Sequence, residues 1–161
     1  MAITIRKITH RPWPVTVRIP VCDETTGQVA ELEQTFIAHW QAFSESTLKA
    51  VFEEADRHFP PPAAGSVLPL DVALKKNAWV FAQLLTGWSA VRDESENDIP
   101  YTEEALTDWV CGADGLALSA GLNASLSEIR FGVAPAKNSP TSPAPGPARA
   151  ADEVVAEALP N

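Results

Sequence analysis

The sequence has few of the residues that serve catalysis, metal binding and cross-linking. Among 161 residues there are two cysteines and three histidines. Cys22 and Cys111 lie far apart and form no Cys-x-x-Cys arrangement, so we expect a reduced chain in which both are small buried hydrophobic residues. The histidines form no pair at positions i and i+4, the spacing of a helical metal site.

Other signatures of chemistry are also missing. The segment Gly-Ala-Asp-Gly at 112–115 lacks the lysine and the spacing of a phosphate-binding loop. There is no Gly-x-Ser-x-Gly turn for a serine nucleophile, and neither cysteine has a base nearby in the sequence. We therefore predict a protein that binds rather than an enzyme, with no cofactor, no catalytic residue and no metal ion.

Basic residues are outnumbered. The chain has 12 Lys and Arg against 21 Asp and Glu, and its net charge of −9 argues against a nucleic-acid partner. Residues 1–22 carry four bases and no acid, whereas residues 93–114 carry eight acids and no base. In the simpler interpretation, each of these charged segments lies on the surface and is in contact with water. Alternatively, the two segments attract each other, within one chain or between the copies of a homo-oligomer.

Long apolar runs are absent too. The longest uncharged apolar stretch, 78–91, is too short and too polar to span a bilayer, and the first ten residues lack the apolar run of a signal peptide. We expect a soluble intracellular protein with no membrane partner. Its hydrophobic content of 45% and five tryptophans suffice for the core of one domain.

Two alternating runs open the chain and predict a β-hairpin. Val15, Val17, Ile19 and Val21 share one face, and a second run continues to Trp40 after a polar turn. Because Pro14 and Pro20 lack the N–H that a central strand donates, we place the first strand at a sheet edge.

From Ser44 onward the apolar spacing becomes helical. Ser44 is expected to cap a first helix that the prolines at 60–62 end, and Thr102 to cap a third helix that Gly112 ends. A second helix begins near Asp71, and its apolar stripe continues to Leu85 and Trp88. A fourth covers 114–131.

The fold class predicted is α+β, mostly α, with an N-terminal antiparallel β-hairpin packed on a bundle of about four helices. We assign residues 1–133 to this domain. Residues 134–161 are predicted to be a flexible Pro/Ala/Ser-rich tail, because five prolines stand among 134–147 and little apolar surface is present to offset the entropy of ordering.

An acidic segment connects the second and third helices. Asp93, Ser95, Asn97 and Glu104 have the spacing of a calcium-binding loop, but Asp98 stands where that loop needs glycine. We favour a solvated connection whose acids lie beside the positive end of the next helix, and keep a calcium-dependent module as an alternative.

Tryptophans are the candidate contacts with a partner. Each is first a candidate for the core, yet a small aromatic-rich helical domain often leaves a groove for a partner helix. We select Trp79, Trp40 and Trp109 as partner-binding residues. Trp79 is the foremost, because it lies off the apolar stripe of its helix.

The order of these elements resembles the tail assembly chaperones of long-tailed, siphovirus-type bacteriophages. The likeness covers roughly residues 13–138. It is closest at Gly87-Trp88, Val91, Asp93-Glu94 and Ile99-Pro100-Tyr101-Thr102-x-Glu104-x-Leu106. The resemblance implies that Trp88, Ile99, Pro100, Tyr101 and Thr102 form a structural corner between two helices.

The resemblance also implies a non-catalytic function. Such chaperones bind and solubilise the tape measure protein and help the tail tube protein to polymerise around it, often through a longer frameshifted form. The expected location is the host cell cytoplasm, with the protein absent from the mature virion. The alternative is a small phage or bacterial adaptor or inhibitor that binds a host protein.

Overall fold

The computed structural model describes residues 8–132, which form a three-stranded antiparallel sheet and four helices. The fold is mixed α+β with helices slightly predominating, as the sequence predicted. The elements in chain order are β1 (His10–Cys22), β2 (Val29–Gln41), α1 (Glu45–His58), α2 (Leu70–Leu84), β3 (Leu85–Ser89), α3 (Glu103–Val110) and α4 (Gly115–Phe131). The predicted tail at 134–161 lies outside the described residues.

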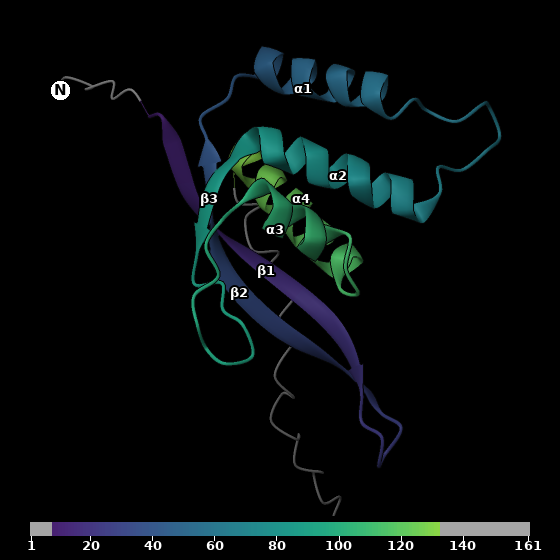
Figure 1. Cartoon of the computed structure of the whole chain (residues 1–161), viewed down its shortest axis with the longest axis vertical. Coiled ribbons are helices and arrows are strands. Elements are labelled where there is room, and N and C mark those ends of the chain that lie inside the picture. Colours follow the sequence, from purple (N-terminus) through teal and green to yellow (C-terminus); the bar gives the residue numbers. More distant parts are fainter. Residues whose placement is uncertain (1–7, 133–161) are drawn as a thin grey trace, which may run out of the picture.

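The predicted hairpin is confirmed. β1 and β2 pair antiparallel over their whole length, from His10 opposite Gln41 to Cys22 opposite Val29. The sheet order is β1-β2-β3, so the proline-containing β1 is an edge strand, as expected. In Figure 1 the far end of the hairpin projects beyond the helices.

The third strand is a correction to the predicted second helix. α2 ends at Leu84, and Leu85 and Trp88 lie in β3 instead of continuing the helical stripe. β3 pairs with β2, with Trp88 opposite Ala38 and Leu85 opposite Trp40. Thr86 and Gly87 are poor helix formers. In β3, Gly87 pairs with His39 of β2, and the Thr86 hydroxyl donates a hydrogen bond to the His39 carbonyl oxygen at 3.0 Å.

The helices cover one face of the sheet. Val15, Val17, Phe36, Ala38 and Trp40 point into the core on that face, whereas the opposite face is polar or part-exposed. α4 packs closely on β1 at Gly121, which has no side chain. A Cβ at this position would lie 2.6 Å from the carbonyl oxygen of Thr16. α1 packs on the outer side of α2, away from the sheet (Figure 1).

The predicted helix caps are confirmed. The Ser44 hydroxyl accepts a hydrogen bond from the Thr47 N–H at 3.1 Å, and the Thr102 hydroxyl accepts one from the Ala105 N–H at 3.0 Å. Gly112 follows Cys111, the residue that caps the end of α3. The Ser44 and Thr102 hydroxyls each satisfy a backbone N–H that the first helical turn leaves without a partner.

The burial predicted for both cysteines is wrong. Cys22, at the hairpin end, and Cys111, after α3, are exposed free thiols. Within residues 8–132 no helix combines the length and apolarity needed to cross a bilayer.

Candidate binding surface

Trp88, Ile99 and Tyr101 come together where β3 ends, so the predicted corner lies between a strand and α3 and not between two helices. The indole N–H of Trp88 donates a hydrogen bond to the Ile99 carbonyl oxygen at 2.7 Å. The Tyr101 ring meets the Trp88 ring edge-on, with 4.9 Å between centroids, and its hydroxyl donates to the Leu85 carbonyl oxygen at 3.4 Å. Pro100 lies between these two contacts in the chain. Burial, and then the nearby Glu103 carboxylate, raise the pKa of the Tyr101 hydroxyl.

The acidic connection closes on itself through Asp93. One carboxylate oxygen of Asp93 accepts hydrogen bonds from the backbone N–H groups of Ser95 and Asn97, at 2.8 and 2.9 Å. The backbone bond from Asn97 is the largest reason that the pKa of Asp93 lies below its usual value. The Ile99 N–H then returns to the Val91 carbonyl oxygen at 2.9 Å, so the segment is a compact turn.

The calcium alternative gains no geometric support within residues 8–132. In that part of the chain no three His, Cys, Asp or Glu side chains are grouped so that they could hold a metal ion.

A serine and a histidine meet on the open face of the sheet, an arrangement that the sequence analysis missed. His39 Nε2 and Ser89 Oγ lie 2.8 Å apart, across the pairing of β2 with β3. Within residues 8–132 no side chain hydrogen-bonds the other ring nitrogen of His39, so no third group there orients the imidazole as a catalytic base requires. The pair joins the two strands.

The three tryptophans selected from the sequence lie in three different places. Trp40 is a correction, because its side chain is 0% exposed and its indole N–H donates to Ser125 Oγ inside the core at 3.0 Å. The alternation of apolar and polar residues correctly placed Trp40 on the apolar face of the strand. It could not show that the helices bury this part of the face completely. Trp79 is half-buried between α1 and α2, with its ring 5.1 Å from the His58 ring, so only part of it faces solvent.

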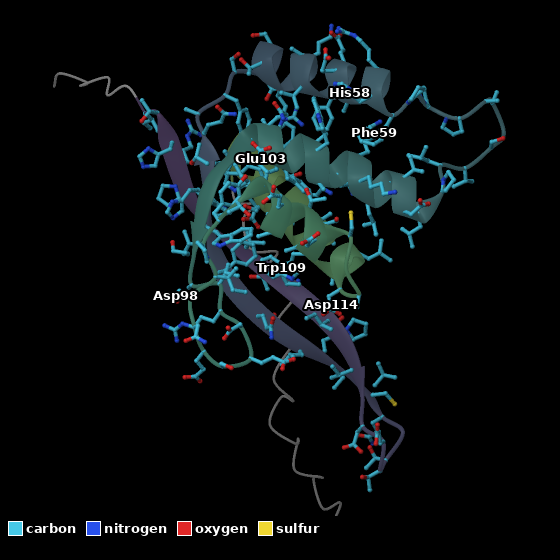
Figure 2. All side chains as sticks on the ribbon, in the orientation of Figure 1. His58, Phe59, Asp98, Glu103, Trp109 and Asp114 are labelled. Atoms are coloured by element: carbon cyan, nitrogen blue, oxygen red, sulfur yellow. The ribbon has the colours of Figure 1, made fainter. Side chains whose placement is uncertain are left out.

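Trp109 is the one of the three that lines a groove. Figure 2 shows it beneath α3 and over the hairpin. Its ring lies 5.3 Å from that of Phe36 and 5.7 Å from that of Trp88. The groove has a volume of about 310 Å³ and is lined by Val17, Gln34, Thr35, Phe36, Ala90, Val91, Arg92 and Trp109.

An exposed apolar surface continues from this groove along the hairpin. Val17 lines the groove, and the next residues on the same face are Ile19 with its partner Leu32, and then Val21 with its partner Ala30. Leu32 is 46% exposed and Val21 is 41% exposed. We call Ile19, Val21, Ala30 and Leu32 the hairpin face. Ile19 is half-buried against the core, and beyond it the helices do not extend over the far end of the hairpin (Figure 1).

The alternating sequence pattern placed Ile19 and Val21 on the apolar face of the hairpin but did not indicate that part of this face is exposed. Periodicity assigns side chains to faces and does not say where the covering helices stop. The groove depends on β3, which the sequence analysis had read as helix.

Comparisons with known proteins identify no relative. No family model, no curated protein and no solved structure matches this chain.

Proposed function

We infer that this chain is a tail assembly chaperone of a long-tailed bacteriophage, which binds and solubilises the tape measure protein and assists tail tube polymerisation without catalysis. Its proposed site of action is the host cytoplasm, and we expect it to be absent from the virion. Contact with the tube protein would come through a longer frameshifted form. The resemblance at residues 87–106 is the sequence feature that supports this proposal.

The observation that carries the binding function is the apolar surface formed by the groove and the hairpin face. A two-stranded ribbon is about 10 Å wide, since neighbouring strands lie about 4.8 Å apart, and this matches the diameter of one α-helix of about 10 Å. An amphipathic client helix could therefore lie along the hairpin, with its apolar side on Leu32 and Val21 and toward Trp109.

The acidic character of the chain suits this use. The net charge of −9 would keep a complex with an apolar client in solution. Several copies on one long client would also add avidity, so each single contact need only be weak.

The test is co-expression with the long helical tail protein encoded beside this chain. We expect the client to move from the pellet to the soluble fraction and to co-purify. Val21→Glu should abolish solubilisation, because it places a charge on the hairpin face. Val67→Glu is the matched control, because Val67 is 89% exposed on the loop before α2.

Two results would contradict the proposal. One is a client that remains insoluble with the wild-type chain. The other is recovery of a host protein alone, which would favour the adaptor or inhibitor alternative.

A further inference from the structure

The edge of β2 that faces away from β1 is paired along only part of its length. β3 pairs with β2 between Ile37 and Trp40, and the chain then turns away at Ala90, whose φ is 63°. Within residues 8–132, no backbone group outside β1 pairs with residues 29–36 of β2. A row of backbone donors and acceptors is therefore open to an added strand.

This open edge differs from the outer edge of β1. β1 carries Pro12, Pro14 and Pro20, which remove donors and block the addition of a strand. Residues 29–36 contain no proline. They contain Glu31 and Glu33 and no basic residue, and Ala90–Arg92 line the same groove as Gln34–Phe36. The open edge is thus acidic and selects for a basic strand.

The chain itself contains a basic segment with strand character. Residues 2–8 read Ala-Ile-Thr-Ile-Arg-Lys-Ile, with Ile3, Ile5 and Lys7 on one side of an extended chain and Thr4, Arg6 and Ile8 on the other. Isoleucine and threonine favour strands, and the segment carries two positive charges and no acid.

We propose that residues 2–8 of a second copy pair antiparallel with residues 29–35 of β2, so that the chain self-assembles by strand addition. In one register, the side chains on both faces of the added strand lie opposite suitable partners on β2. With Ile5 opposite Leu32, Arg6 lies opposite Glu31 and Ile8 opposite Val29.

That register uses groups that are otherwise exposed. Leu32, Val29 and Ile8 are 46%, 74% and 53% exposed, and each gains an apolar neighbour. Glu31 makes no ion pair with any residue of 8–132, whereas Glu33 already binds Arg18 at 3.1 Å. Opposite charges and apolar pairs placed directly across strands stabilise the pairing, and like charges there oppose it.

The segment of the same chain is too far from this edge. Ile5 precedes His10 by five residues, which span at most about 18 Å when fully extended. Leu32 lies opposite Ile19, nine residues along β1 from His10, which is about 30 Å in a strand. The strand must therefore come from another copy.

A cross-linking experiment tests the contact. Cys22→Ser and Cys111→Ser give a background free of thiols, because both cysteines are exposed and no packing is lost. In this background, chains with Ile5→Cys and chains with Leu32→Cys are mixed under mild oxidation. Directly opposed residues in an antiparallel pair are about 4.5–5.5 Å apart, within the range for a disulfide. We expect a covalent dimer containing one chain of each type.

Ile5→Cys mixed with Val67→Cys is the control and should give only background dimer. Cross-linking of the first pair that is no greater than the control would overturn the proposal. So would a chain carrying both substitutions that closes an internal disulfide at high dilution.

Charge exchange gives an independent measurement on the full chain with its own cysteines. Sedimentation should show a concentration-dependent oligomer. Arg6→Glu and Glu31→Lys should each raise its dissociation constant at least about threefold, and the double variant should recover most of the loss. A monomer at every concentration, or a double variant no better than the single ones, would refute strand addition. No client is present, so failure here leaves the proposed function untouched.

Discussion

Trp88→Phe should destabilise the domain through the corner, without involving a partner. The substitution keeps one aromatic ring but removes the N–H that donates to the Ile99 carbonyl oxygen at 2.7 Å. It also removes part of the edge-on contacts with Tyr101 and Trp109, whose ring centroids lie 4.9 and 5.7 Å from that of Trp88. A lost hydrogen bond costs about 1 kcal/mol, and each weakened aromatic contact a further ~0.5–1 kcal/mol.

The expected loss is therefore ~2–3 kcal/mol of unfolding free energy, or a Tm lower by about 6–12 °C for a domain of this size. Urea unfolding followed by circular dichroism measures it directly. Trp79→Phe is the matched control, because that ring packs on His58 and donates no hydrogen bond to any residue of 8–132. If the two substitutions cost the same, the corner is not held by the bond from Trp88 to Ile99.

Three further outcomes are expected. Gly121→Ala would place a methyl group 2.6 Å from the Thr16 carbonyl oxygen, so α4 must move and about 1–3 kcal/mol should be lost in urea unfolding; unchanged stability would show that this helix contact can relax. Thr102→Ala should cost about 1 kcal/mol through the lost cap of α3, and an equal Tm would contradict that role. Because the pKa of Asp93 is lowered in the folded state, its stabilisation is present above the unfolded pKa and is lost as pH falls through the folded one. Stability measured from about pH 5 to pH 2 should then fall more steeply for the wild type than for Asp93→Asn, and parallel curves would contradict this.

Local signals in the sequence predicted most of the fold. The hairpin follows from strict alternation, and the starts of α1 and α3 follow from Ser44 and Thr102, because each hydroxyl acts on a backbone group three residues away. Such features depend on neighbours in the chain and need no knowledge of the tertiary structure.

The start of β3 shows where that approach fails. The spacing from Phe81 to Leu85 and on to Trp88 fits a helical stripe as well as it fits a helix followed by a strand. Pairing with β2 decides between them, and pairing is a tertiary contact. Trp40 was misassigned for a related reason, since only the packing of α4 shows that its indole reaches Ser125.

The corner and the candidate binding surface depend on each other. β3 lasts only five residues, because the chain turns at Ala90 and the hydrogen bond from Trp88 holds the returning segment at Ile99. That early turn leaves residues 29–36 of β2 without a second neighbour and opens the groove beside Trp109. Substitutions in the corner should therefore reduce the affinity for the client only in proportion to the free energy of unfolding that they remove. Val21→Glu should weaken binding while the free energy of unfolding stays the same, and this difference separates a residue that shapes the surface from one that contacts the client.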